Sequence, residues 1–184
     1  MSKEIVLCFL DMNSPEIADH WLNRFAARLA PKTSNGLPKI HVELLFKETN
    51  DTEGMACSIY YDKQVHYYKK RFSRLNWSFR SIYCSTQAYN KIKNYCRNAA
   101  GCKFNKIGYF LFWLGIRLSG QYPCKFGYRP RYFCSEIITQ ALKAGGVLNN
   151  EQPSVIHPET LYRLVAPAST LTTIRNWDQK AMNY

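Results

Sequence analysis

Cys134 is the residue of this chain that is best placed to act as a nucleophile. It opens an apparent helix in "RYFCSEIITQALKAGGV", residues 131–147, where apolar residues recur at helical spacing and Gly145 and Gly146 mark the end. A helix N-terminus favours the reactive thiolate, because the macrodipole and the first backbone N–H groups face the sulfur. The same N–H groups, including that of Cys134, could form an oxyanion hole for acyl transfer.

His41 is the leading candidate for the base that such a nucleophile needs. Of the four histidines, it alone lies in a strongly predicted core strand, "IHVELLF", residues 40–46. A rigid strand backbone can aim the imidazole. Glu43 follows two residues later, so strand alternation places both side chains on one face, where the carboxylate could orient the ring.

Each of these residues also has a purely structural interpretation. A free cysteine at the edge of an apolar helical stripe often simply packs in the core. A lone histidine such as His41 is often structural, and Glu43 could be a solvent-facing strand residue. The hypothesis of a catalytic site therefore depends on the combination of all three.

The elements that must position these residues predict an α+β fold. The expected strands cover residues 4–10, 40–46, 56–61, 64–69 and 77–84. The third and fourth of these read as a hairpin that is joined through Asp62 and Lys63. The expected helices cover residues 15–29, 85–100 with Ser85 as N-cap, 105–118 and 134–144, and a short helix lies in "HPETLYRLV".

Length and composition are those of one folded domain. The chain has 184 residues, of which 46% are hydrophobic and 21% charged, which excludes a disordered or fibrous protein. The seven cysteines lack the paired spacing of a disulfide framework or zinc site, which favours free thiols in a reducing compartment, with no metal and no cofactor. The amino terminus does not resemble a signal peptide, and the longest apolar run, residues 107–116, is too short for a transmembrane segment. We therefore expect an intracellular protein that is not secreted.

The net charge of +12 favours acidic partners, such as an acidic substrate, an anionic membrane surface or nucleic acid. Basic and aromatic residues interleave in "VHYYKKRFSR", residues 65–74, and in "YPCKFGYRPRYF", residues 122–133. This mixture suits phosphate attraction and base stacking. No recognised nucleic-acid motif accompanies it, and a solvated basic sheet face and loop explain the same pattern.

Several segments resemble the circularly permuted branch of the NlpC-type papain-like cysteine peptidases, including members from large DNA viruses. In that branch the histidine strand precedes the cysteine helix, as "IHVELLF" precedes "FCSEIITQAL" here. The segment "KFNKIGYFLF", residues 103–112, is similar to the aromatic–Asn/Asp–x–x–Gly segment of the family, and "HPETLYRL" resembles the proline-containing segment after the nucleophile helix. The resemblance covers residues 39–164, preceded by a strand and helix in residues 1–38 and followed by a tail in residues 165–184.

The resemblance implies a papain-like core in which an antiparallel sheet packs against the nucleophile helix. It implies a viral thiol-dependent hydrolase or acyltransferase, in which Cys134 attacks an amide, ester or thioester carbonyl and His41 serves as base and then acid. The orienting residue often lies on the next strand in this family, so Ser58 and Tyr60 stay alternatives to Glu43.

The family pattern also leaves room for a protein without turnover. Many members have Ser-His-x-Gly where this chain has Ile-His-Val-Glu, residues 40–43. A catalytically inactive papain-like fold, acting as a virion, structural or nucleic-acid-binding basic protein, is therefore the second hypothesis. His66 or His157 would replace His41 only if the strand prediction is wrong.

Overall fold

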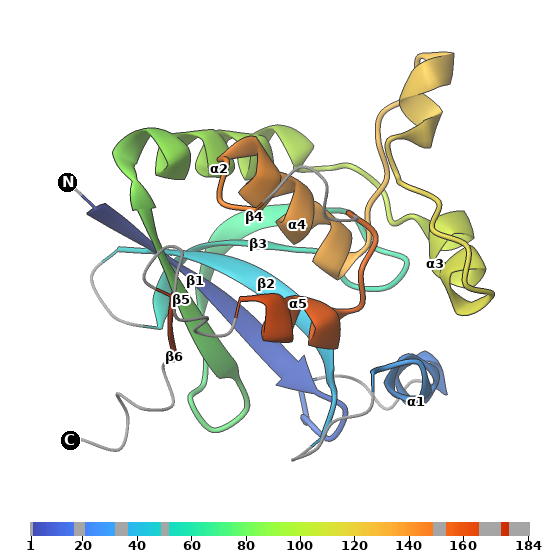
Figure 1. Ribbon diagram of the computed structural model, residues 1–184, viewed down its shortest axis with the longest axis horizontal. Coiled ribbons are helices and arrows are strands. Elements are labelled where there is room, and N and C mark those ends of the chain that lie inside the picture. Colours follow the sequence, from blue (N-terminus) through green and yellow to red (C-terminus); the bar gives the residue numbers. More distant parts are fainter. Residues whose placement is uncertain are drawn as a thin grey trace.

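An antiparallel sheet forms the centre of the computed structural model, which describes residues 2–16, 21–31, 37–48, 52–148, 154–165 and 174–176. The strand order is β4-β3-β2-β1-β5-β6 (Figure 1). The strands are β1 (Ser2–Asp11), β2 (Lys39–Lys47), β3 (Glu53–Ser58), β4 (His66–Arg71), β5 (Ser78–Ser85) and the three-residue edge strand β6 (Ile174–Asn176). β1 therefore lies in the interior of the sheet, paired with both β2 and β5.

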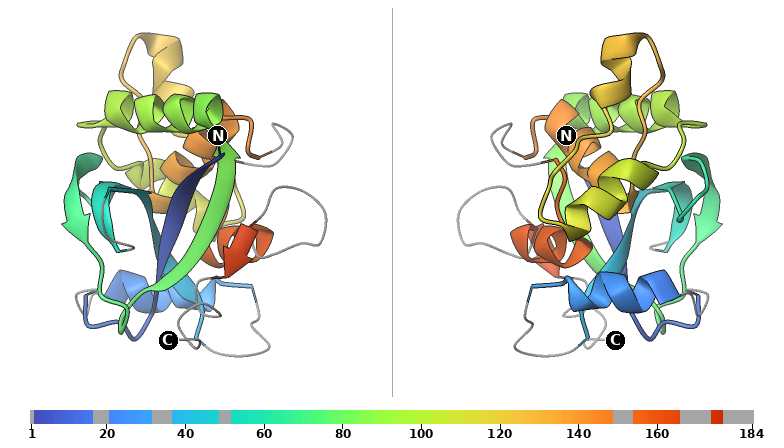
Figure 2. Two further views of the ribbon diagram at one scale, coloured as in Figure 1. Left: turned by 90° about the vertical axis from the view of Figure 1, so that its left-hand side faces the viewer. Right: turned by 90° about the vertical axis from the view of Figure 1, so that its right-hand side faces the viewer.

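Most of the helices follow the first five strands in the sequence. The described helices are α1 (Trp21–Arg28), α2 (Thr86–Ala99), α3 (Lys106–Trp113), the 3-10 helix η1 (Tyr122–Phe126), α4 (Cys134–Ala144) and α5 (Pro158–Leu164). α2 and α4 contact each other, and α4 and α5 both contact β2. α1 lies at the opposite end of the sheet from α2 (Figure 2). The structure thus confirms the α+β class.

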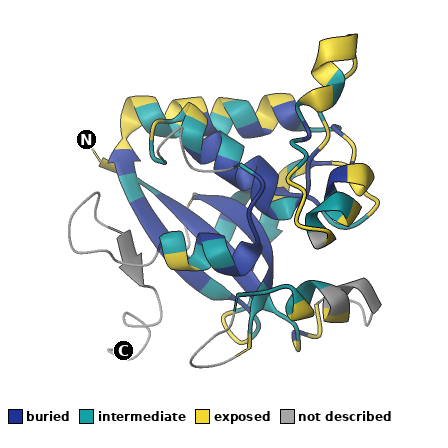
Figure 3. Ribbon diagram, turned by 45° about the vertical axis from the view of Figure 1, so that its right-hand side comes forward, coloured by how far each residue is buried: buried dark blue, intermediate teal, exposed yellow. Residues whose placement is uncertain are grey.

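The sheet is buried on both of its faces around β2 (Figure 3). On one face Val42 and Leu44 belong to the main core cluster, together with Ile138 of α4. The other face holds a smaller cluster that includes Leu45 and Trp77. Because side chains alternate along a strand, burial on both faces explains why β2 reads as a nearly continuous apolar run.

The connection between β3 and β4 differs from the predicted two-residue turn. The last pair of this hairpin is Ser58 with His66, so residues 59–65 form a longer loop, in which Asp62 has a left-handed φ of 59°. The reason is tertiary: Val65 is buried and its N–H bonds to the carbonyl oxygen of Cys102, while Gln64 forms a bridge with Lys103. These contacts withdraw residues 64 and 65 from the hairpin ladder.

Two predicted helices are shorter in the structure. α3 ends at Trp113 instead of continuing to residue 118, because Gly115 adopts a left-handed φ of 77° that stops the helix. Of the expected helix over residues 15–29, the structure contains α1; residues 15, 16 and 29 form turns instead, and residues 17–20 lie outside the described part of the chain. None of the described helices is long and apolar enough to cross a membrane.

Candidate active site

The structure brings Cys134, His41 and Glu43 together. Cys134 is the first residue of α4 and His41 the third residue of β2, so the two side chains meet where both elements begin, close enough for the cysteine to raise the pKa of His41. The Nε2 atom of His41 lies 3.2 Å from Oε1 of Glu43. This leaves Nδ1 of the ring for the cysteine. His41 and Glu43 are two residues apart on β2, and their side chains lie on one face of the strand, as the alternation predicts.

Two aromatic rings hold the imidazole in place. The ring of Tyr60 stacks on His41 with a centroid distance of 4.5 Å and an interplanar angle of 23°. Trp77 approaches the same imidazole edge-on, at 6.1 Å. His41 itself is only 7% exposed. Because rotation of the ring would break the stacking and both hydrogen bonds, the imidazole is restricted to one orientation.

Glu43 is fully buried, and three donors converge on one of its oxygens. The hydroxyl of Tyr60 donates to Oε1 at 2.7 Å, and Nζ of Lys70 donates to the same atom at 2.7 Å, in addition to the contact with His41. The ammonium group of Lys70 also lies 4.6 Å from the ring centroid of Trp77. A buried carboxylate needs such partners, because an isolated charge would be costly to desolvate.

These contacts explain the ionisation of the pair. Burial alone would lower the pKa of His41, but its hydrogen bonds to Cys134 and Glu43 outweigh that effect and raise the pKa to about 9. Burial would raise the pKa of Glu43, whereas the hydrogen bond and charge of His41, followed by Lys70, bring it below its ordinary value. The arrangement thus favours an imidazolium ring beside a carboxylate anion.

Lys70 is a member of this site that the sequence did not single out. It lies on β4, in the basic segment whose sequence predicts a solvated sheet face or a nucleic-acid site. The side chain is only 14% exposed and bonds to Glu43, while its neighbour Lys69 is paired with Glu48 and Glu53. Because side chains alternate along a strand, the sequence indicates that Lys70 and Lys69 lie on opposite faces of β4. Nothing in the sequence identifies Glu43 as the partner of Lys70.

The two alternative histidines have structural contacts or are exposed, and the two alternative orienting residues differ in what they contact. His157 caps α5 by accepting from the N–H of Glu159, and its Nε2 lies 3.0 Å from the carbonyl oxygen of Ala26. His66 lies exposed on β4. Ser58 is buried, but its hydroxyl has no hydrogen-bond partner among the described residues. Tyr60 contacts both His41 and Glu43, so it supports the pair.

Glu136 fastens the start of α4 to the preceding loop. Its Oε1 accepts hydrogen bonds from the N–H of Gly120 at 2.6 Å and from the hydroxyl of Ser119 at 3.1 Å. A Cβ atom at residue 120 would collide with the carbonyl oxygen of Arg131, so only glycine fits there. Glu136 therefore makes a contact over 16 residues, which holds the first turn of α4 in position.

The Asn–x–x–Gly pair also has a structural basis. Asn105 is the N-cap of α3, and its Oδ1 accepts from the N–H of Gly108 at 2.9 Å. Its amide nitrogen donates to the carbonyl oxygen of Leu118 at 3.2 Å. A Cβ atom on Gly108 would collide with the Asn105 amide. Asn105 thus fixes residue 118, and Glu136 fixes the next two residues of the same loop, 119 and 120.

The cysteines differ strongly in accessibility. All seven are free: Cys124 is exposed and Cys134 partly exposed, whereas the other five are buried. Among the described residues there is no group of three or more His, Cys, Asp or Glu side chains that could hold a metal ion. Comparisons with models of known protein families, with curated proteins and with solved structures found no match.

Proposed function

We propose that this protein is a thiol-dependent hydrolase or acyltransferase with a circularly permuted, papain-like core of the NlpC type. Cys134 is the nucleophile, His41 the general base and acid, and Glu43 the residue that orients His41. The observation that carries this proposal is the series from Cys134, at a helix N-terminus, through His41 to Glu43, in which Cys134 raises the pKa of His41 and the imidazole lies 3.2 Å from the carboxylate. Such a series is the usual arrangement for an activated cysteine.

The order of the elements supports the proposed core. The strand that carries His41 precedes the helix that begins with Cys134, and that helix packs on an antiparallel sheet. This order is opposite to that of ordinary papain-like enzymes. It agrees with the motif order on which the resemblance to the permuted branch, with its viral members, is based.

The proposed reaction has two steps. The thiolate of Cys134 attacks the carbonyl carbon of an amide, ester or thioester, and the resulting oxyanion is stabilised by N–H groups at the start of α4. When the tetrahedral intermediate collapses, the bond to the leaving group breaks and His41 supplies the leaving group with a proton. Water or an acceptor nucleophile then gives its proton to His41, attacks the acyl-enzyme and releases the Cys134 thiolate.

The surroundings of the site favour an acidic substrate. Tyr60 lines a hollow of about 390 Å³ that also borders Lys63, His66 and Tyr68. The positive charge of Lys63 would attract anionic groups towards the site, in keeping with the net charge of +12. The proposal includes an intracellular reducing compartment, where a nucleophilic thiol remains free.

The first test is the alkylation of Cys134 by iodoacetamide. In a Cys124→Ser background the exposed competitor is absent, so peptide mass spectrometry can compare Cys134 with five buried thiols. We expect Cys134 to react quickly at mildly acidic pH, and His41→Ala to slow this reaction about tenfold or more. His66→Ala removes an exposed histidine and serves as the matched control. Equal labelling in wild type and His41→Ala would remove His41 from the mechanism.

The second test is turnover. A screen of peptides, ubiquitin-like conjugates and acyl lipids should reveal one class that wild type cleaves or transfers, with Cys134→Ala inactive but folded. Glu43→Gln keeps the shape of the side chain and should lower kcat by about tenfold to a hundredfold. If Cys134 is labelled no faster than the buried thiols and no class is turned over, the proposal is wrong and the inactive papain-like protein is the better hypothesis.

A further inference from the structure

Exposed residues gather on the segment that contains α3 and η1 (Figure 3), and many of them are large and apolar. Of the ten large apolar side chains that are exposed in the described part of the chain, seven lie between residues 107 and 128. The most exposed of them are Leu114 at 75%, Tyr128 at 71%, Ile107 at 64% and Phe126 at 63%. Single exposed apolar residues need no explanation, but a cluster of this kind marks an interaction site.

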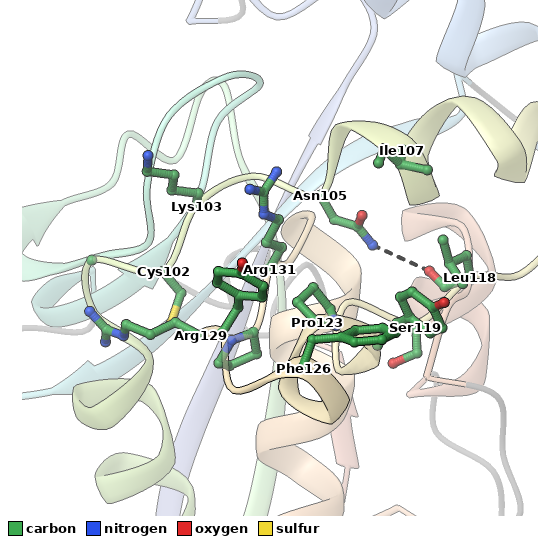
Figure 4. Close-up of a pocket in the computed structure, with 14 residues that line it drawn as sticks. Cys102, Lys103, Asn105, Ile107, Leu118, Ser119, Pro123, Phe126, Arg129 and Arg131 are labelled. Atoms are coloured by element: carbon green, nitrogen blue, oxygen red, sulfur yellow. Dashed lines mark hydrogen bonds between the residues drawn. The ribbon is translucent and has the colours of Figure 1, made fainter.

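Four of these seven side chains line a hollow of about 610 Å³ between α3 and η1 (Figure 4). Ile107 lines it from α3, and Tyr122 and Phe126 line it from η1. The cations Lys103 and Arg131 stand at its border. None of the proposed catalytic residues lines this hollow, so the surface is separate from the thiol site.

The loop that carries η1 is anchored at its base. The N–H of Arg131 donates to the carbonyl oxygen of Gly120 at 2.8 Å, which closes the two ends of the loop on each other. The N–H of Gly120 is bonded to Glu136 at the start of α4. The exposed tip is therefore presented from a fixed base, and it stands out from the body of the molecule (Figure 1).

Basic residues predominate around this cluster, and the acidic Asp62 borders it, paired with Lys106 of α3 at 2.6 Å. Residues 63–135 contain fifteen Lys and Arg and no Asp or Glu. Within the same surface, Lys103, Arg117, Lys125 and Arg131 are exposed. A surface that combines exposed apolar tips with surrounding cations complements an anionic phospholipid layer, in which phosphates lie directly above an apolar interior.

We propose that the α3–η1 surface, defined as the exposed side chains of residues 103–131, binds to the face of a membrane rich in anionic phospholipid. Phe126 and Tyr128 enter the interfacial layer while the cations contact phosphates. The aliphatic Leu114 and Ile107 favour lipid over nucleic acid, because aliphatic side chains offer no stacking surface for bases. This proposal does not depend on the proposed function, because it uses none of the proposed catalytic residues. Cys134→Ala should therefore bind the membrane as well as wild type does.

The test is flotation of the full chain with phosphatidylcholine vesicles, with and without phosphatidylserine. We expect binding only to the vesicles that contain phosphatidylserine, and a decrease of binding at high salt. Phe126→Ser combined with Tyr128→Ser should lower the bound fraction about tenfold or more. Leu75→Ser is the apolar control, because Leu75 is 96% exposed outside this surface.

A second pair of variants tests the charge. Arg117→Gln with Lys125→Gln should weaken binding, whereas Lys3→Gln with Lys91→Gln removes the same charge from β1 and α2 and should not. The proposal is overturned if the surface and control variants bind vesicles alike, or if wild type does not bind phosphatidylserine vesicles. It is also overturned if the surface variants lose binding to a single-stranded oligonucleotide but still bind the vesicles.

Discussion

The Nε2 atom of His41 lies 3.2 Å from Oε1 of Glu43, two residues further along the same strand. Cys134, at the start of α4, is the other side chain that raises the pKa of His41. One short stretch of β2 therefore supplies both the base and its orienting carboxylate.

The first prediction concerns the titration of His41. Its pKa is raised from 6.5 to about 9 by Cys134 and Glu43 against the effect of burial. Cys134→Ala removes one of these partners, so the pKa of His41 should fall. NMR of the imidazole resonances measures this change, with His157, whose pKa is lowered by burial, as an internal control that stays unchanged.

The same shift has a consequence for stability. A group whose pKa is raised on folding stabilises the folded state below its unfolded pKa, and this contribution is lost as the pH rises through the folded value. For His41 the free energy of unfolding should therefore decrease between pH 6.5 and about 9. If the pKa of His41 is the same in wild type and in Cys134→Ala, the contact between His41 and Cys134 is contradicted.

The second prediction concerns Lys70. Lys70→Met keeps much of the apolar stem but leaves the buried Glu43 with one charge partner fewer, so unfolding in urea should show a loss of about 2 kcal/mol. Glu43→Gln should reduce the effect of the lysine change, since the two side chains share a contact of 2.7 Å. A double-mutant cycle measures this coupling, and strict additivity of the two changes would argue against the contact.

The third prediction concerns Glu136. Burial raises its pKa from 4.5 to about 7, against the hydrogen bonds from Gly120 and Ser119. Its contribution to stability is therefore present below pH 4.5 and is lost as the pH rises through about 7. Glu136→Gln keeps an acceptor for the Gly120 N–H but does not ionise, so its stability relative to wild type should increase by about 3 kcal/mol over that interval.

A matched variant separates ionisation from hydrogen bonding at this position. Glu136→Ala removes the acceptor and should destabilise the protein at every pH, by about 2 kcal/mol. Urea unfolding at several pH values distinguishes the two variants. If Glu136→Gln follows the wild-type pH profile, Glu136 does not titrate in this interval.

The fourth prediction compares two helix N-caps. Ser85 caps α2 at the surface, while Asn105 caps α3 and also bonds to Leu118 from a buried position. Ser85→Ala should cost about 1 kcal/mol and Asn105→Ala about 2 kcal/mol, because the second change also leaves a buried carbonyl group without its donor. Thermal unfolding measures both, and equal losses would show that the bond to Leu118 contributes nothing.

Local patterns were sufficient for much of the fold. The run in residues 40–46, the Ser85 cap and the double glycine after α4 each predicted an element that the structure contains. Where tertiary contacts compete with local preference, the prediction was wrong: the bonds of residues 64 and 65 to residues 102 and 103 lengthen the β3–β4 loop.

The candidate site divides in the same way. The sequence by itself determined that Cys134 begins a helix and that His41 and Glu43 share one face of a strand, because helix starts and strand alternation are local properties. Only the tertiary structure decided that the two elements begin beside each other, that Lys70 shares the Glu43 oxygen and that Glu136 holds residue 120. These contacts join distant parts of the chain, and their geometry depends on the packing of the whole sheet against α4.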